Sequence, residues 1–214
     1  MIKQQLLSTG LALLLASSLP FTALADTTDT TVSIRDGSDH TIGSIDYTNT
    51  NYALDVHGNG TNVTVDGNVK SDNGYGITAG DNSTTTVKGD LSANRVAINA
   101  GGEAEVTIDG DVRGTGSTSN TIEVGGKTDI TVKGDVIAED TSAIRTDQEA
   151  NVTVDGSIKA GNGGISAWGY GEDGKNNTSL TVGKDVDGSR SGIDATNGAD
   201  VKVGGNVSSG GTGV

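Results

Sequence analysis

Apolar and polar residues alternate in a short phrase that recurs along most of this chain. In the first copy Val63, Val65 and Val69 are apolar, and Thr, Asp, Gly and Asn separate them. Further copies begin at Thr85, Val106, Ile130, Val152, Leu180 and Val201. The copies start roughly 21 to 28 residues apart, a period typical of solenoid repeats. Alternation at every second residue predicts β-strands.

A second apolar pattern precedes each copy. It begins at Leu54, Ile77, Ile98, Ile122, Ile144, Ile165 and Ile193, and Val, Ala or Thr follows two positions later. Gly, Asn, Asp and Ser lie between the patterns and suit sharp corners. We therefore predict an all-β fold, a parallel β-helix (β-solenoid) with a right-handed coil. It has about seven rungs, each a turn of roughly 22 residues with two clear strands and a third short one.

The alternation also predicts which side chains face the interior. Val63, Val65, Val69 and their equivalents should point inward and stack in columns. The threonines between them should point outward; these are Thr64, Thr86, Thr107, Thr131, Thr153 and Thr181.

Composition agrees with continuous stacking. The chain has 34 Gly, one Pro and no Cys among 214 residues, and 32% of its residues are hydrophobic. Proline removes a hydrogen bond from a sheet, so its absence after Pro20 suits uninterrupted strands. Intrinsic disorder is the competing interpretation of such polar sequence. Disorder does not require Val and Ile at fixed offsets, so the solenoid is favoured.

The chain divides into three segments. Residues 1–25 resemble a secretory signal peptide, with Lys3, an apolar run and an Ala23-Leu24-Ala25 cleavage site. A buried N-terminal helix is the alternative for this segment. Residues 26–50 are expected to form a cap-like stretch, and 51–214 the repeats. Val214 falls at the first inward position of a further rung, so we expect the gene to continue with more rungs and a membrane anchor or barrel.

The formal net charge is −14, and loss of a leader carrying Lys3 makes the remainder more negative. Such a charge disfavours nucleic acid and anionic lipid as partners. The residue before the turn glycine alternates in sign along Asp66, Lys88, Asp109, Lys133 and Asp155. Stacking in register would bring these opposite charges together.

The position after the turn glycine instead places like charges on consecutive rungs, at Asp90, Asp111 and Asp135. Two interpretations remain open. Short Asp side chains can hydrogen-bond the backbone of their own turn, or they can form a weak calcium site, which needs several oxygen ligands. No other metal or cofactor is expected, because the sequence has no His or Cys cluster of the zinc type.

No catalytic residues are predicted. His40 and His57 both lie near the start of the repeats, and the arginines share no common offset on adjacent rungs. The sixth copy carries an insertion, and insertions in repeat proteins often lie on the binding face. Its aromatic and acidic residues are the candidate ligand-binding residues, namely Trp168, Tyr170, Glu172 and Asp173. Alternatively, Trp168 folds back to cover the flank of the solenoid.

A signal peptide followed by Gly-, Thr- and Val-rich repeats without Pro or Cys resembles the passenger region of bacterial autotransporters and haemagglutinin-type adhesins. The resemblance covers about residues 50–214 and is one of repeat style. It implies an exported, non-catalytic protein at the cell surface, outer membrane-associated or extracellular, that mediates attachment or aggregation. Its partner would be a host-cell, bacterial-surface or glycan ligand, without membrane insertion by this segment. A polysaccharide-active lyase or hydrolase with the same fold is the alternative.

Overall fold

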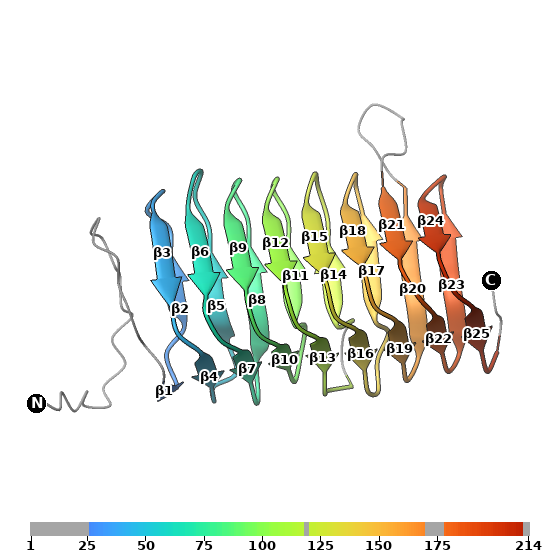
Figure 1. Ribbon diagram of the computed structural model, residues 1–214, viewed down its shortest axis with the longest axis horizontal. Coiled ribbons are helices and arrows are strands. Elements are labelled where there is room, and N and C mark those ends of the chain that lie inside the picture. The colour runs from blue at the N-terminus through green and yellow to red at the C-terminus, as the bar shows by residue number, and fades with distance from the viewer. Residues whose placement is uncertain (1–25, 118–119, 170–177, 212–214) are drawn as a thin grey trace, which may run out of the picture.

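A computed structural model describes residues 26–117, 120–169 and 178–211 of the chain and shows a stack of short parallel strands (Figure 1). The expected signal peptide and Val214 lie outside these residues. The strands form three long sheets, here named A, B and C, that run side by side along the stack. Each rung contributes one strand to each sheet, which confirms the predicted third strand.

Sheet A contains nine strands: β1 (Asp26–Thr28), β4 (Ile45–Tyr47), β7 (Val69–Ser71), β10 (Leu91–Ala93), β13 (Val112–Gly114), β16 (Val136–Ala138), β19 (Ile158–Ala160), β22 (Val186–Gly188) and β25 (Val207–Ser209). Sheet B contains eight: β2 (Val32–Ile34), β5 (Tyr52–Val56), β8 (Tyr75–Ala79), β11 (Ile98–Ala100), β14 (Ile122–Val124), β17 (Ile144–Asp147), β20 (Gly163–Trp168) and β23 (Ser191–Thr196). Sheet C contains eight: β3 (Asp39–Ile42), β6 (Asn62–Val65), β9 (Thr84–Val87), β12 (Glu105–Ile108), β15 (Asp129–Val132), β18 (Asn151–Val154), β21 (Ser179–Val182) and β24 (Asp200–Val203).

Neighbouring strands in a sheet come from consecutive rungs and pair in parallel. Val63 of β6 pairs with Thr85 of β9, which pairs with Val106 of β12. This arrangement confirms the parallel β-solenoid, with about eight turns spaced roughly 22 residues apart. The described residues contain no helix. The right-handed coil remains a prediction.

The eighth turn comes from the segment that we expected to be cap-like. Residues 26–50 supply β1 to β4, which stack in register on the strands that follow. His40 pairs with Val63 and so takes the inward position that an apolar residue or Thr85 holds in the later rungs.

The core is a narrow column of aliphatic side chains inside the three sheets. Val63, Val65 and Val69 are each exposed by 2% or less. The intervening Thr64 is only partly buried, and Thr181 at the equivalent position is exposed. The predicted inward and outward faces of these strands are therefore confirmed. A narrow interior also explains how 32% hydrophobic residues suffice.

The turn between sheets C and A carries a ladder of Asp and Asn side chains. The backbone N–H of Asp111 donates to Asp90 Oδ1 at 2.9 Å, and that of Asp135 donates to Asp111 Oδ1 at 2.8 Å. The side chains therefore bond the next rung rather than their own turn. Each carboxylate accepts a hydrogen bond from a backbone N–H of the next rung. This hydrogen bond offsets the repulsion between the stacked like charges.

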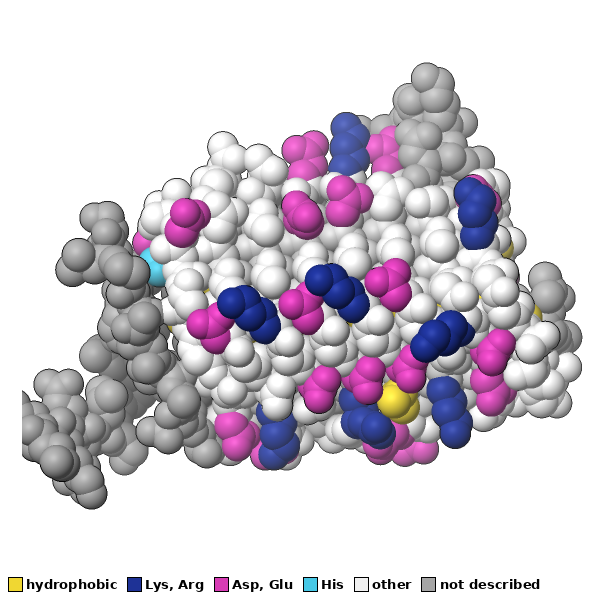
Figure 2. Space-filling view, in the orientation of Figure 1, with side chains coloured by type: hydrophobic (Ala, Val, Ile, Leu, Met, Phe, Trp, Pro, Cys, Tyr) yellow, Lys and Arg dark blue, Asp and Glu magenta, His cyan; other side chains and the backbone are white. Residues whose placement is uncertain are grey.

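A second ladder crosses the same turn and pairs opposite charges. Lys88 Nζ lies 2.7 Å from Asp66 Oδ1, and Lys133 Nζ lies 2.7 Å from Asp109 Oδ1. Figure 2 shows this row of alternating acidic and basic side chains across the middle of the molecule. The alternation in the sequence thus becomes ion pairing between neighbouring rungs, as predicted.

Candidate binding surface

The outer face of sheet B carries a polar column that differs from the other ladders. Outward side chains of consecutive rungs pair in register from Asp55 to Thr78, Asn99, Glu123 and Arg145. Strand geometry places successive members about 4.8 Å apart. This column therefore presents five different polar groups in a straight line along the stack.

Glycines lie beside this column, at the position that follows the last inward residue of each strand. Gly80, Gly101 and Gly125 occupy three consecutive rungs, with His57 before them and Asp147 after them. Because glycine has no side chain, the surface is hollowed here. A cavity of about 290 Å³ lies against His57 and Gly101, and a second of about 190 Å³ lies against Gly125 and Asp147.

Both cavities are lined by Asn99, so they follow one another along the sheet. We call this hollow the sheet B furrow. Gly101 forms its open floor, whereas the His57 ring lies over Gly80 and the Asp147 carboxylate lies over Gly125. Its walls include His57, Thr78, Asn99, Glu123, Arg145 and Asp147.

One end of the furrow is formed by a charged cluster around Asp55. Asp55 Oδ2 accepts hydrogen bonds from Arg35 Nη2 at 2.7 Å and from Ser33 Oγ at 3.0 Å. Asp55 Oδ1 lies 2.7 Å from His57 Nδ1, in ion-pair contact but outside hydrogen-bond alignment. The other edge of the imidazole faces the furrow, since a Cβ at Gly80 would lie 2.9 Å from His57 Nε2.

The opposite end combines Arg145, Asp147 and Trp168. Arg145 Nη2 lies 3.9 Å from Asp147 Oδ2, and its Cζ lies 5.7 Å from the centre of the Trp168 ring. The indole Nε1 of Trp168 donates to Ser166 Oγ at 3.0 Å. Trp168 is 41% exposed, so its ring lies against the outer face of sheet B at the end of the furrow and keeps part of its surface open to solvent.

Between these ends, polar side chains lack partners. Thr78, Asn99 and His57 Nε2 have no side-chain hydrogen bond to any residue in the described part of the chain, and all three residues are only partly buried. Some outward groups of the other sheets pair along the stack: Asn151 donates to Asp129 at 2.9 Å on sheet C, and Arg113 pairs with Glu139 at 2.9 Å beside sheet A. Unpaired groups that face a hollow are available to a ligand.

An aromatic stack borders the other edge of sheet B. The rings of Tyr52 and Tyr75 lie 4.9 Å apart, and Arg95 Cζ lies 4.7 Å from the centre of the Tyr75 ring. Tyr75 is therefore held between Tyr52 and Arg95. This arrangement fixes the corner between sheets A and B and leaves no free ring face on Tyr75 for stacking with a ligand.

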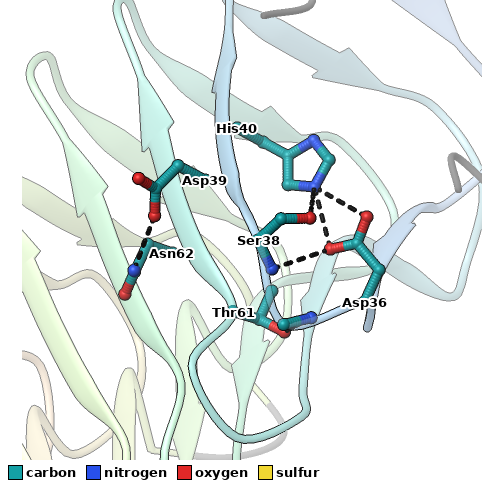
Figure 3. A network of polar contacts seen from close by, with 7 residues as sticks. Asp36, Ser38, Asp39, His40, Thr61 and Asn62 are labelled. Atoms are coloured by element: carbon teal, nitrogen blue, oxygen red, sulfur yellow. Dashed lines mark hydrogen bonds and ion pairs between the residues drawn. The ribbon is translucent and has the colours of Figure 1, made fainter. Parts of the chain in front are cut away.

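A second histidine, His40, contacts both an acid and a hydroxyl (Figure 3). His40 Nε2 lies 2.9 Å from Asp36 Oδ1, and the same nitrogen lies 3.5 Å from Ser38 Oγ. A nucleophile triad needs one ring nitrogen for each partner, so this network is not arranged as a relay. His40 is 5% exposed, and the network closes the inner column of the first rung with a satisfied polar group.

The network also shifts a pKa. Burial tends to raise the pKa of Asp36, but hydrogen bonds from His40 and Ser38 outweigh it and lower the pKa below its ordinary value of 3.8. The charged carboxylate is therefore favoured in the folded protein.

The predicted ligand-binding residues fall in two groups. Trp168 is described and lies at the end of the furrow, whereas Tyr170, Glu172 and Asp173 lie outside the described residues. The calcium candidates Asp90, Asp111 and Asp135 each use Oδ1 to accept a backbone N–H from the next rung. The described residues contain no group of three or more His, Cys, Asp or Glu side chains that could hold a metal ion.

The furrow was not predicted, although the sequence carries two signals of it. Asp55 and His57 stand two residues apart on a predicted strand, which places both on one face. Gly80, Gly101 and Gly125 each follow the last inward residue of the strand before them. Arg145 was set aside for its offset, yet it lines the furrow together with Glu123 and Asp147.

Comparisons with known proteins find no matching protein family, no similar curated protein and no similar solved structure. The described residues contain no helix that is long and apolar enough to cross a membrane. The geometry of the molecule is therefore the basis for a functional proposal.

Proposed function

We propose that this chain is an exported, non-catalytic β-solenoid that is displayed on the cell surface or secreted and mediates attachment or aggregation. In this proposal it resembles the passenger region of autotransporter or haemagglutinin-type adhesins. The stack acts as a rigid scaffold, and one of its lateral faces binds the partner.

The observation that carries the proposal is the hollow on the outer face of sheet B, which polar side chains without side-chain partners border. Lys88 and Lys133 pair with acids of neighbouring rungs, so these groups support stacking. Thr78 and Asn99 face a hollow without side-chain partners among the described residues. Repeat proteins commonly bind through an extended lateral surface of this kind.

Export is supported by the sequence of residues 1–25, which has Lys3, an apolar run and an Ala23-Leu24-Ala25 cleavage site. Mass spectrometry of the protein recovered outside expressing cells should find Asp26 as the N-terminal residue. Recovery of the chain only inside the cells, with residues 1–25 attached, would contradict export.

Attachment can be tested with beads that carry the purified protein. Coated beads should adhere to bacterial or host cells, or to one another, more than beads coated with an unrelated acidic protein. The heat-denatured chain provides a matched control, because it has the same charge without the stacked surface. Equal adhesion of the folded protein and both controls would overturn the proposal.

A second function, polysaccharide lyase or hydrolase activity, is favoured by one observation. Asp55 Oδ1 lies 2.7 Å from His57 Nδ1, and the imidazole lines the furrow, so an acid and a histidine of the type used in acid–base catalysis lie together at this end. Under the main proposal, neutral and acidic polysaccharides incubated with the protein gain no new reducing or unsaturated ends. Turnover of a polysaccharide that disappears in His57→Ala would show that the protein is an enzyme and would contradict the adhesin proposal.

A further inference from the structure

We propose that the sheet B furrow binds an uncharged polysaccharide laid along the stack axis. This inference rests on the proposed binding function and specifies its ligand class. It goes beyond the insertion-loop residues that the sequence suggested, because it places the main contacts on the regular rungs.

The shape of the furrow suits a short stretch of an extended polymer. His57 and Asp147 are four rungs apart, about 19 Å at the usual strand spacing, and their side chains reach over Gly80 and Gly125. The open stretch between them is centred on Gly101 and is bordered by Thr78, Asn99 and Glu123. A Cβ at Gly101 would meet only Gly125 O, at 3.6 Å, so the middle of the furrow is open.

The available groups match hydroxyls. Thr78 can donate and accept, Asn99 can do both through its amide, and His57 Nε2 adds a further site. Glu123 has one oxygen engaged, since Asn120 Nδ2 donates to Oε1 at 2.9 Å, whereas Oε2 has no hydrogen-bond partner among the described residues. A sugar hydroxyl both donates and accepts, so it satisfies such a mixed row of groups, whereas a ligand of one polarity does not.

A peptide strand fits this surface less well. Peptides commonly bind β-structure by adding to an open sheet edge, but the furrow lies on the face of sheet B. The backbone N–H groups of its floor are already used: Gly80 donates to Val56 at 3.0 Å and Gly101 donates to Ala79 at 3.1 Å. The floor therefore offers a peptide backbone no hydrogen-bond donors.

The charge of the furrow excludes polyanions. Its lining includes the acids Asp81, Glu123 and Asp147 but only one arginine, Arg145. That arginine is already near Asp147, at 3.9 Å. An acidic polysaccharide would meet a net negative surface on a strongly acidic protein, so electrostatics favour a neutral chain.

The test uses affinity electrophoresis of the purified protein in gels that contain dextran, mannan or xylan, with polygalacturonate and a poly-glutamine peptide as comparison probes. Gly101→Tyr fills the furrow, and its Cβ has room. Thr107→Tyr places the same ring on the outer face of sheet C and is the matched control. Circular dichroism and the Tm of each variant check that both fold.

We expect retardation by at least one neutral polysaccharide and loss of about tenfold or more in affinity in Gly101→Tyr. Thr107→Tyr should stay close to the parent protein. A double variant, Thr78→Ala with Asn99→Ala, should weaken binding by about tenfold without blocking the furrow.

Four results would overturn the inference. Retardation only by polygalacturonate, only by the peptide, or by no probe would exclude a neutral polysaccharide as the ligand. Neutral polysaccharide binding that is unchanged in Gly101→Tyr would show that the furrow is not the binding site. If beads carrying Gly101→Tyr lose adhesion although no neutral polysaccharide binds, the ligand class fails while the adhesin function stands. If the parent beads do not adhere at all, the proposed function fails independently.

Discussion

The carboxylate of Asp90 occupies the space directly beside Gly110 in the next rung. A Cβ at Gly110 would overlap Asp90 Oδ1 and would lie 2.7 Å from Gly89 O. The same oxygen accepts the backbone N–H of Asp111 at 2.9 Å. The turn glycine is thus required by the Asp90 side chain and the Gly89 carbonyl stacked against it, and its φ angle is not positive.

Gly110→Ala should therefore destabilise the protein by about 1–3 kcal/mol through overpacking. Denaturant unfolding would measure this as a lower midpoint. One rung of the chain accommodates a side chain at the glycine position. Lys184 stands there, and its backbone N–H donates to Gly156 O at 3.2 Å. The rung before it carries Ser157 in place of Asp.

The combination of Ser157 with Lys184 suggests a second variant, in which the Asp side chain is shortened together with the change of the glycine. Asp90→Ser combined with Gly110→Ala should recover part of the lost stability, because a serine hydroxyl can rotate away from the new methyl group. A double-mutant cycle measures the coupling between the two sites. Simple additivity of the two changes would show that Asp90 does not set the glycine requirement.

Thr85→Val should stabilise the protein by about 1–2 kcal/mol. Thr85 is fully buried in the inward column between Val63 and Val106, and its Oγ1 has no hydrogen-bond partner. Valine has nearly the same shape and removes the unpaired hydroxyl. Thr86→Val on the outer face is the control, and we expect a change within about 0.5 kcal/mol. Equal effects of the two substitutions would contradict this explanation.

Asp36→Asn should alter the acid limb of the stability curve. The folded pKa of Asp36 is lowered, despite the opposing effect of burial, by hydrogen bonds from His40 and Ser38. A lowered folded pKa contributes stability above the ordinary value of 3.8, and this contribution is lost as the pH falls through the lower, folded value.

The stability gap between the parent protein and Asp36→Asn should therefore be widest at neutral pH and should close below pH 3.8. Urea midpoints measured across the acid range would show this. Asp194→Asn, on the exposed face of β23, removes the same charge as a control. A gap that stays constant through the acid range would exclude the Asp36–His40 contact as its cause.

The lysine ladder predicts an effect at alkaline pH. Hydrogen bonds to Asp66 and Asp109 are the main cause that raises the pKa of Lys88 and Lys133 above the ordinary value of 10.5. A raised folded pKa contributes stability that is fully present below 10.5 and lost as the pH rises through the folded value.

Lys88→Met with Lys133→Met should abolish this part of the alkaline loss of stability. Salt should narrow the difference from the parent protein at neutral pH, since exposed ion pairs are screened. Lys127→Met is the control, because Lys127 is exposed and forms no ion pair within the described residues. An equal change in the Lys127 variant would assign the effect to net charge rather than to the ladder.

Much of the fold could be predicted because a solenoid is nearly one-dimensional. Val63, Val65 and Val69 alternate with polar residues, and this local pattern alone fixes which side chains face inward. The repeat spacing fixes which residues stack, so the pairing of Lys88 with Asp66 followed from the sequence. The extra turn was missed because Val32 and His40 do not follow the common phrase, although they stack in register with Leu54 and Val63.

The candidate site depended on more than the period. The sequence determined the strands, their register and the charge ladders, because these follow from alternation and repetition along one chain. Only the tertiary structure decided where each rung turns its corners between the three sheets. It therefore also decided that Asp55, His57, three glycines and Asp147 share one outer face. A hollow depends on which side chains are missing between others in space, and that follows from the angle of the corners, which the two-residue period does not contain.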